Sequence, residues 1–404
     1  MSTSNTANTL NNTGLTPSTE VMAMIERLIA FQTVSRDSNL GLIEWTRDYL
    51  AGLGVASRLT YDASGKKANL FATLGEGPKP GLILSGHTDV VPVEGQAWDT
   101  DPFKAIVKDG LLYGRGSADM KSYIATALAL APQFLAAGMA APLHFALSYD
   151  EEVGCIGVQG LIKDLQELGL KPAGCIVGEP TSMQPIIAHK GTHRFRCCIR
   201  GREAHSSYTT MGVNSIEYAA RIIVYIRQMA DRFAQLETRD YGFTVPYTTM
   251  QTGVIHGGLA SNIVPKDCKF EFEARTMPGI DVEHLYQEIQ GFAATLLPEM
   301  QKVEPDAAID FEWLASAPGL SMQESDAVVQ LASALARNKP NGAVSYGTEA
   351  GLFQRAGIPT VVCGPGSIEQ AHRPNEFVSL EQVAQCEAFM LRLMDPEMQL
   401  QIRK

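Results

Sequence analysis

Acidic residues and histidines come directly after apolar runs of this sequence or, in one case, just before a long helical stretch. If the runs are strands of a parallel sheet, their carboxyl ends meet at one edge, where ligands and catalytic groups converge. An edge with these side chains could bind metal ions and carry out acid–base chemistry. The residues so placed are His87, Asp89, Asp119, Glu151, Glu152, Glu179 and His372.

Five of these side chains form a set of two imidazoles and three carboxylates, which suits zinc, cobalt or manganese. Two divalent ions about 3.5 to 4 Å apart can share a bridging carboxylate and activate a water molecule held between them. Asp119 is the candidate for the bridge. The five predicted ligands are His87, Asp119, Glu152, Glu179 and His372.

Glu151 stands beside a predicted ligand and is itself unused, so we predict that it is the base that manages the proton of the attacking water. Asp89 could accept a hydrogen bond from the second ring nitrogen of His87 and fix its tautomer. Simpler explanations exist for each residue alone. An aspartate is common at helix caps, Glu151 and Glu152 could form a solvated turn, and His87 and Asp89 could be a plain hydrogen-bonded pair.

From residue 20 to about residue 188 the sequence alternates short apolar runs with helical stretches. This order is typical of an α/β domain, a mostly parallel sheet with helices on both faces. The clearest strands are GLILSGHTD, LHFALSYDEE and GCIVGEP, and GIPTVVCGPG repeats the pattern near the C-terminus. Between the first two, SYIATALALAPQFLAAG predicts a long, deeply buried helical stretch.

The sequence from residue 189 to residue 317 changes character and predicts a separate small domain. Apolar and charged residues alternate in RFRCCIR, KFEFEAR and IDFEW, as in strands exposed on one face. Asn214 is expected to cap one helix, with Glu217 three residues later, and Asp281 to open another. The first helix should bury the face that contains Ile216, Ala220, Ile223, Ile226, Ala230 and Phe233.

The order strand, helix, two strands, helix, strand is that of a split βαβ layer, which is an α+β arrangement. We therefore predict a discontinuous catalytic domain, residues 20–188 and 318–404, with an inserted lid, residues 189–317. Residues 1–19 lack the basic and apolar segments of a secretory signal and are predicted to be a flexible leader.

The composition excludes several classes of protein. With 404 residues the chain should form two or three domains. Its net charge of −11, without a basic stripe, argues against nucleic-acid binding, and no apolar run approaches the ~20 residues that span a membrane. Seven cysteines without a C-x-x-C pair indicate reduced thiols rather than disulfides. We predict a cytoplasmic protein that acts on a small molecule.

Seven strings occur in an order that resembles the di-zinc aminoacylase and carboxypeptidase family of metallopeptidases. They are SGHTDVVP, GRGSADMK, DEEVG, GEPTS, GREAHSS, GGLASNIVP and GPGSIEQAH. The resemblance covers nearly the whole chain after the leader, and the set is specific although no single string is. It implies a catalytic domain with two zinc ions, an inserted ferredoxin-like lid that usually forms a homodimer, and hydrolysis of an N-acyl amino acid.

Carried over to this sequence, the resemblance implies that His87 and Glu179 bind one zinc ion and that Glu152 and His372 bind the other. Asp119 binds both ions in this scheme. Cobalt is a possible substitute for zinc.

The resemblance also supports Glu151 as the general base and Asp89 as the residue that orients the histidine. It implies, in addition, a cis peptide bond after Asp119.

His205 matches a lid histidine that helps to stabilise the tetrahedral oxyanion, often from the partner subunit. A helix-start histidine bonded to one of the two following serines is the alternative. Arg275 and Asn262 resemble the pair that holds the substrate carboxylate, a task suited to a guanidinium group. Glu349 is a candidate counter-ion for a substrate ammonium group, with a structural helix cap as the alternative.

The substrate is expected to be N-acetylornithine, cleaved to ornithine and acetate in arginine biosynthesis. GEPTSMQPIIAHKG and SYGTEAGLFQRAGIPTVVCGPGSIEQAHRPNE resemble family members that act on this substrate more than those that act on succinyl-diaminopimelate, although GRGSADMK also has the desuccinylase form. N-acetylcitrulline, a general aminoacylase substrate and a short peptide are further alternatives. A catalytically silent binding protein is disfavoured by the intact Glu151 and ligand set, and a serine hydrolase by the lack of a G-x-S-x-G elbow.

Overall fold

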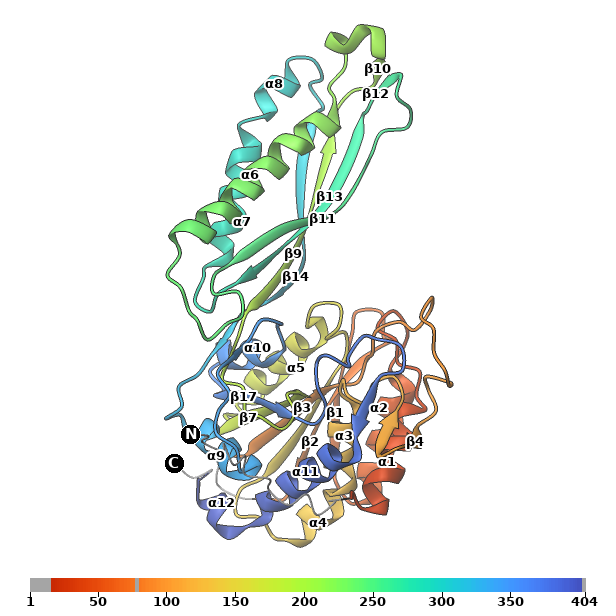
Figure 1. Ribbon diagram of the computed structural model, residues 1–404, viewed down its shortest axis with the longest axis vertical. Coiled ribbons are helices and arrows are strands. Elements are labelled where there is room, and N and C mark those ends of the chain that lie inside the picture. The colour runs from red at the N-terminus through yellow and green to blue at the C-terminus, as the bar shows by residue number, and fades with distance from the viewer. Residues whose placement is uncertain (1–15, 77–79, 402–404) are drawn as a thin grey trace, which may run out of the picture.

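The apolar runs predicted as strands lie side by side in one six-stranded sheet (Figure 1). The structure is a computed structural model that describes residues 16–76 and 80–401, so residues 1–15 of the predicted leader lie outside it. The strand order is β1-β2-β6-β3-β7-β17; the last four strands are parallel, and β2 is antiparallel to both of its neighbours. The strands are β1 Ser57–Tyr61, β2 Ala68–Leu74, β3 Leu82–His87, β6 Leu143–Ser148, β7 Gly174–Pro180 and β17 Thr360–Gly364.

Every residue of β3, β6 and β7 is buried, because helices cover both faces of the sheet. Helices α5 and α10 pack on one face, α3 and α9 pack on the other, and α1 and α11 lie behind α3. This arrangement confirms the predicted α/β domain. The helices are α1 Thr19–Ile29, α2 Leu40–Gly52, α3 Lys121–Ala129, α4 Ala131–Ala136, α5 Ile156–Glu167, α9 Ala327–Ala336, α10 Ala350–Arg355, α11 Leu380–Leu391 and α12 Pro396–Gln401.

The stretch SYIATALALAPQFLAAG forms two successive helices, so the continuous helix that its composition favours is interrupted. Helix α3 ends at Ala129 and α4 begins at Ala131, where Pro132 lies in the first turn. Proline lacks a backbone N–H and its ring obstructs the preceding turn, so it is tolerated at a helix start but not inside one. The deep burial of α3 is as predicted, and the expected cis peptide bond lies just before this helix, between Asp119 and Met120.

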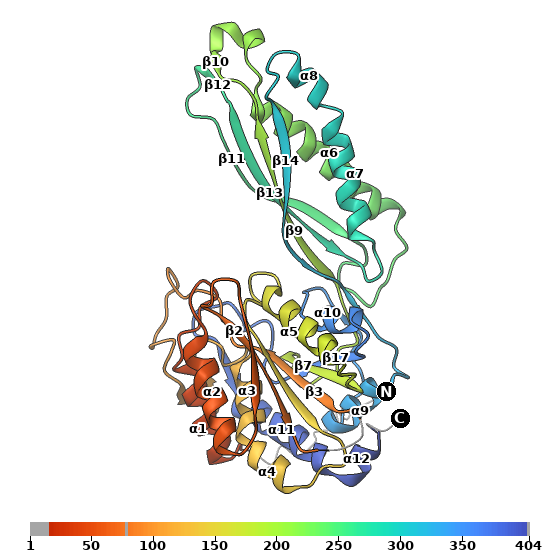
Figure 2. The ribbon, with the colours of Figure 1, turned by 180° about the vertical axis from the view of Figure 1, so that it is seen from behind.

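A second, elongated domain stands on the first and has a hydrophobic core of its own (Figures 1 and 2). Its antiparallel sheet has the order β11-β13-β9-β14, and α6 and α7 cover one face. Its main elements follow the predicted order of strand, helix, two strands, helix and strand. They are β9 Gly191–Arg200, α6 Ser215–Leu236, β11 Thr249–Gly257, β13 Asp267–Thr276, α7 Val282–Ala294 and β14 Ala308–Ala317, with the shorter α8 Leu297–Gln301 before β14.

The helix caps of this domain are as predicted. Asn214 accepts hydrogen bonds from the backbone N–H groups of Ile216 and Glu217, and Asp281 caps α7 in the same way. The predicted buried face of α6 is partly wrong, because the helix is turned so that Ile216 is exposed while Ala230 is buried as expected. The apolar residues that it buries are Ala219, Ile222, Ile226, Met229 and Ala230.

The chain crosses between the two domains at two adjacent places. Strand β8, Ala188–His189, comes just before the second domain and pairs with β15, Leu320–Ser321, which comes just after it. The remaining small strands are β16 Ala343–Val344, paired with β8; β4 Ile106–Lys108, β5 Leu111–Tyr113 and β18 Phe377–Ser379, which form a three-stranded sheet; and β10 Ala204–His205 with β12 Ile263–Val264.

Within the described ranges, no helix has the length and apolar character needed to cross a membrane. All seven cysteines lie in these ranges and are free thiols.

His189 is buried at the crossing in a site that suits the neutral ring. Its Nδ1 lies 2.9 Å from the carbonyl oxygen of Lys190, to which it donates, and its Nε2 lies 3.1 Å from the hydroxyl of Thr348. That hydroxyl accepts from the N–H of Ala350, so its own proton points to Nε2. Burial lowers the pKa of His189 to about 4.

We expect His189 to make stability depend on pH. Its pKa in the folded protein is lower than in the unfolded chain, so the unfolded chain binds more protons and stability falls as pH drops from about 6.5 toward 4. The effect is on the order of 2–3 kcal/mol. The midpoint temperature of thermal unfolding should therefore fall less over this pH range for His189→Gln than for the wild type. For His284→Gln, at an exposed site, it should fall as it does for the wild type. Parallel curves for the wild type and His189→Gln would contradict the assignment.

Candidate active site

Three parallel strands end beside one another and bring the predicted residues to one edge of the sheet. His87 is the last residue of β3 and pairs in register with Ser148, the last residue of β6. Glu151 and Glu152 follow β6 closely, and Glu179 lies near the end of β7. Their meeting follows from the parallel direction of the strands.

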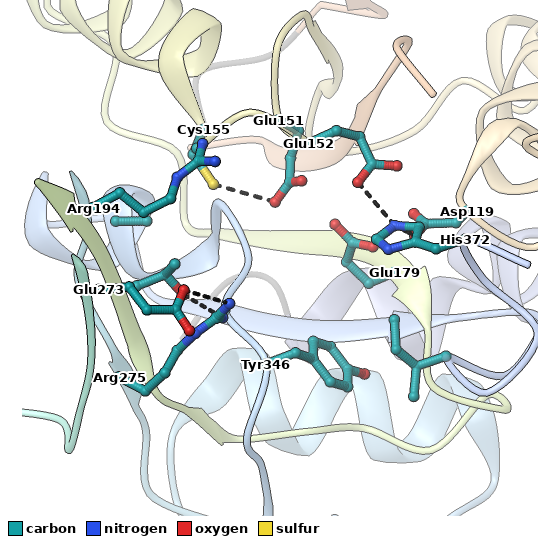
Figure 3. Close-up of a pocket in the computed structure, with 15 residues that line it drawn as sticks. Asp119, Glu151, Glu152, Cys155, Glu179, Arg194, Glu273, Arg275, Tyr346 and His372 are labelled. Atoms are coloured by element: carbon teal, nitrogen blue, oxygen red, sulfur yellow. Dashed lines mark hydrogen bonds and ion pairs between the residues drawn. The ribbon is translucent and has the colours of Figure 1, made fainter. Parts of the chain in front are cut away.

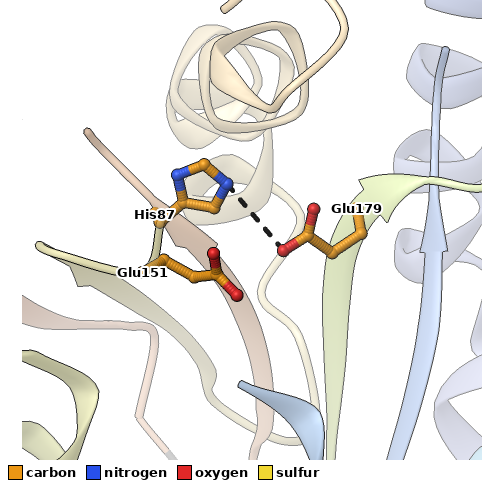
Figure 4. A group of neighbouring side chains, drawn as sticks. All are labelled: His87, Glu151 and Glu179. Atoms are coloured by element: carbon orange, nitrogen blue, oxygen red, sulfur yellow. Dashed lines mark ion pairs between the residues drawn. The ribbon is translucent and has the colours of Figure 1, made fainter. Parts of the chain in front are cut away.

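Asp119 lies between the two predicted histidine ligands. Nε2 of His87 is 2.9 Å from one carboxylate oxygen of Asp119, and Nε2 of His372 is 3.4 Å from the other. The same His372 nitrogen is 2.9 Å from Glu152 Oε2 (Figure 3), and His87 Nε2 is 3.8 Å from Glu179 Oε1 (Figure 4). All five predicted ligands therefore come together, with one Asp119 oxygen toward each histidine.

Glu151 belongs to the same cluster (Figure 4). It forms one candidate metal group with His87 and Glu179, while His87, Asp119 and Glu152 form another; in each group the ligand atoms lie within 4.8 Å of one another. The cluster thus has candidate ligand groups for two metal ions. Distance alone allows Glu151 to be either a ligand or a base.

Burial makes the clustered glutamates poor anions when no cation accompanies them. Desolvation by burial is the main cause that raises the pKa of Glu151 to about 8 and that of Glu152 to about 7. It also raises the pKa of Glu179, whose Oε1 is buried without a hydrogen-bond partner. Hydrogen bonds with Asp119 and Glu152 raise the pKa of His372 to about 10. A buried carboxylate oxygen without a donor, among so many acids, fits divalent cations.

A buried ion pair holds the loop that carries Asp119. Arg115 Nη1 donates to Glu376 Oε2 at 2.7 Å, and both side chains are only 1% exposed. The Glu376 carboxylate also accepts from the backbone N–H groups of Gly116, Ala118 and Asp119 at 2.8 to 3.1 Å. Glu376 therefore positions the proposed bridging ligand, a role that the sequence did not suggest.

Asp89 acts differently from the prediction. The Nδ1 of His87 lies 2.9 Å from the backbone carbonyl of Asp89, but 3.6 Å from its carboxylate, which is too long for a hydrogen bond. The carboxylate instead accepts from Ser35 Oγ at 2.7 Å and from the N–H groups of Glu151 and Glu152 at 3.1 and 3.3 Å. Asp89 thus orients His87 through its main chain and the two glutamates through its side chain.

A cavity of about 380 Å³ lies between the cluster and the second domain (Figure 3). The cluster lines one side of it. Strands β9 and β13 of the second domain contribute Thr192, Arg194, Glu273 and Arg275 to the lining. The second domain therefore adds a wall with charges of both signs.

Arg275 reaches this cavity, but Asn262, its predicted partner, does not line it. Arg275 Nη1 donates to Thr192 Oγ1 at 2.9 Å, and its Nη2 lies 3.4 Å from Glu273 Oε2. Asn262 precedes β13, whose first residue is Asp267, at the opposite end of that strand. Eight extended residues span about 27 Å, so one chain cannot bring the predicted pair together.

His205 lies at the same distant tip. Strands β10 and β12 pair there, at the end of the second domain farthest from the first (Figures 1 and 2). The ring of His205 is exposed, and its Nδ1 accepts from the N–H of Ser207 at 3.2 Å, as in the helix-start alternative. Within one chain His205 cannot reach the cavity.

Glu349 is not positioned to bind a substrate. It is fully buried, and its two oxygens accept from Ser85 Oγ at 2.6 Å and Ser148 Oγ at 2.8 Å. It is absent from the cavity lining, whereas Tyr346, from the same string SYGTE, is present there. The counter-ion prediction is wrong for this arrangement, because the Glu349 side chain is fully buried and has no surface on the cavity.

Sequence reasoning missed the wall of the second domain. Arg194 and Glu273 occupy the polar positions of RFRCCIR and KFEFEAR, which alternation alone assigns to a solvent-exposed face. The signal that could have found them is their place at the end of each strand nearest the domain crossing, opposite each other in register.

A family model described as peptidase family M20/M25/M40 matches residues 83–395. The chain belongs to peptidase family M20/M25/M40. This result confirms the resemblance found in the sequence motifs. Acetylornithine deacetylase of Pasteurella multocida is 37% identical over 368 residues, which is 89% of this chain and 93% of that protein. Acetylornithine deacetylase of Myxococcus xanthus is 35% identical over 376 residues, with 92% and 95% covered.

A metallo-carboxypeptidase of the M20 family from Sulfolobus solfataricus has a similar structure, with a TM-score of 0.73 over 94% of this chain and 99% of that chain. The two sequences are 17% identical. The likeness therefore concerns the fold, and it shows that the M20/M25/M40 chain described here has the fold of its family.

We predict that Glu376→Gln weakens metal binding. Only one of the two side-chain end groups of glutamine can accept hydrogen bonds, whereas both carboxylate oxygens of Glu376 do so. The variant also leaves Arg115 without a buried counter-charge, so the Asp119 loop should lose its fixed position. Divalent-metal affinity should fall about 10- to 100-fold, as measured by elemental analysis after dialysis against metal buffers. Glu324→Gln, at an exposed site, is the matched control, and equal metal content in both variants would show that Glu376 does not position a ligand.

Proposed function

We propose that the chain removes the acetyl group of N-acetylornithine and releases ornithine and acetate, as a step of arginine biosynthesis. The observation that carries this proposal is a cluster of two histidines and four carboxylates beside a cavity with a charged wall. The acetylornithine deacetylases of P. multocida and M. xanthus, which match most of this chain, support the choice of substrate.

Two divalent ions fit the cluster, with zinc preferred and cobalt as the substitute. We assign His87 and Glu179 to one ion, Glu152 and His372 to the other, and Asp119 to both. Support comes from the two Asp119 oxygens, which face different histidines, and from the unpartnered oxygen of Glu179. When bound, such ions supply Lewis-acid activation of water and of the amide carbonyl group.

Glu151 is the proposed general base. The carboxylate of Glu151 lines the cavity and has an oxygen within 4.8 Å of ligand atoms of His87 and Glu179, close enough to exchange a proton with a water molecule bound there. Glu151 takes a proton from the attacking water, whose oxygen bonds to the acetyl carbon. It then gives that proton to the α-nitrogen as the C–N bond breaks. The glutamate is therefore a carboxylate again at the end of the cycle.

Arg275 is the proposed ligand of the substrate α-carboxylate, because its guanidinium group lines the cavity and can donate two parallel hydrogen bonds. Its position on the wall of the second domain places the carboxylate away from the acidic cluster. The amide can then face the cluster.

We further propose that residues 189–317 are a lid that pairs two chains in a homodimer. The tip exposes apolar residues, among them Tyr208, Met211 and Leu259, the last with 89% of its surface exposed. In such a dimer His205 and Asn262 act at the cavity of the other chain, where His205 donates to the developing oxyanion. Free thiols throughout the chain accord with a cytoplasmic location.

The roles of Glu151 and Glu179 predict opposite results for two similar variants. Glu151→Gln should lower kcat by about 10²- to 10⁴-fold and keep both metal ions, because a base does not hold them. Glu179→Gln should lose one ion. Metal content by elemental analysis and steady-state kinetics test this, and loss of an ion from Glu151→Gln would show that Glu151 is a ligand instead.

The proposed substrate is tested by steady-state kinetics over N-acetylornithine, N-acetylcitrulline, N-succinyl-diaminopimelate and N-acetylmethionine. N-acetylornithine should have the highest kcat/KM, about tenfold or more above N-acetylmethionine, since a charged side chain gains a charge-assisted bond. A chelator should abolish activity, and zinc or cobalt should restore it. Equal rates on N-acetylornithine and N-acetylmethionine would overturn the substrate, and full activity after metal removal would overturn the metal requirement.

A further inference from the structure

We infer that Glu273 is the residue that selects a substrate with a cationic side chain, by binding its ammonium group while Arg275 binds the α-carboxylate. This inference rests on the proposed function and names the group in this chain that makes the site specific for a basic amino acid.

Glu273 and Arg275 lie on the same face of β13. They are two residues apart on an extended strand, so their Cα atoms are about 7 Å apart and their side chains point the same way. The residue between them, Ala274, is buried in the core of the second domain, on the opposite face. Both side chains line the cavity, and both are partly exposed, 24% for Glu273 and 35% for Arg275 (Figure 3). A ligand in the cavity can therefore contact an anion and a cation of the protein at once.

The next acid on this face has a close cationic partner across the strands, whereas Glu273 has none there. Glu271 is opposite Arg196 in register, and Arg196 Nη2 lies 2.8 Å from it. Glu273 is likewise opposite Arg194, but the guanidinium of Arg194 donates to the backbone carbonyl of Val153 in the first domain. The cross-strand cation of Glu273 is thus engaged elsewhere.

The remaining partners of Glu273 in the described part of the chain are one neutral amide and one guanidinium group at a longer distance. Gln251 Nε2 donates to its Oε1 at 3.0 Å, and the nearest charged nitrogen, Nη2 of Arg275, lies 3.4 Å from its Oε2. A carboxylate has about four acceptor positions, so Glu273 keeps capacity for an ammonium group. A substrate can replace the long Glu273–Arg275 contact by two shorter ones of opposite sign.

No other acid of the described cavity lining is available for this task. The lining contains five carboxylates, and four of them, Asp119, Glu151, Glu152 and Glu179, belong to the cluster assigned to the metal ions and the base. Glu273 is the fifth. Glu349, the acid first considered for the ammonium group, is fully buried and does not line the cavity.

The experiment compares N-acetyl-L-ornithine with N-acetyl-L-norvaline, which has the same carbon chain without the ammonium group. In the metal-loaded enzyme, Glu273→Gln should lower kcat/KM for N-acetylornithine about 10- to 100-fold, since a hydrogen bond between charged groups is lost. The value for N-acetylnorvaline should stay within about twofold, because the neutral amide of the variant keeps the shape of the wall. Glu271→Gln, two residues along the same face, is the matched control and should change neither value.

The wild-type arm separates the two proposals. A wild type that cleaves N-acetylornithine no faster than N-acetylnorvaline overturns the proposed substrate before any variant is considered. If the wild type prefers N-acetylornithine and Glu273→Gln keeps that preference, only the role of Glu273 is overturned. Equal losses on both substrates would also overturn it, since they would mean that Glu273 supports Arg275 or the fold. Glu273→Lys should reverse the preference, favouring N-acetyl-L-glutamate over N-acetylornithine.

Discussion

Several acidic side chains are held close together at the edge of a sheet where little water reaches them, and they repel one another there. Such groups are costly to bury as anions unless cations accompany them, and the raised pKa values of Glu151 and Glu152 express that cost. The surrounding structure keeps them in place all the same. Glu376 holds the Asp119 loop through three backbone N–H groups, and Asp89 holds the turn that carries Glu151 and Glu152. Glu376 and Asp89, which are not predicted metal ligands, therefore fix the backbone of the carboxylates that are.

The sequence was sufficient to predict the sheet and the cluster because both follow from local patterns. A short apolar run such as GLILSG has the length expected of a strand buried on both faces, and the polar residue that follows it is then expected at the sheet edge. The motif resemblance added the division of the five ligands into two sets and the cis bond after Asp119. Residues such as His87 and His372 could thus be placed together although most of the chain separates them.

Other features depend on tertiary contacts that no local pattern contains. Which acids line the cavity is decided by tertiary packing, which buries Glu349 against Ser85 and Ser148 and brings Glu273 of β13 to the cavity wall; no local pattern contains this information. The break between α3 and α4 has a cause that is visible in the sequence, Pro132. The prediction of a continuous helical stretch gave more weight to the alanine- and leucine-rich composition than to this proline. The face of α6 differs because the pattern of apolar residues around Ile216 allows two neighbouring stripes, and only packing against β11 and β13 selects one.

The paired crossings, β8 and β15, are the two chain connections of the second domain, and Arg194 adds a hydrogen bond to the carbonyl of Val153 in the first domain. In a rotation about these connections, each atom moves in proportion to its distance from them. Arg275 pairs in register with Thr192, next to the connections, whereas His205 lies at the far tip. If the second domain turned about these connections, the charged wall would stay beside the cluster of histidines and carboxylates, while the tip would move farthest.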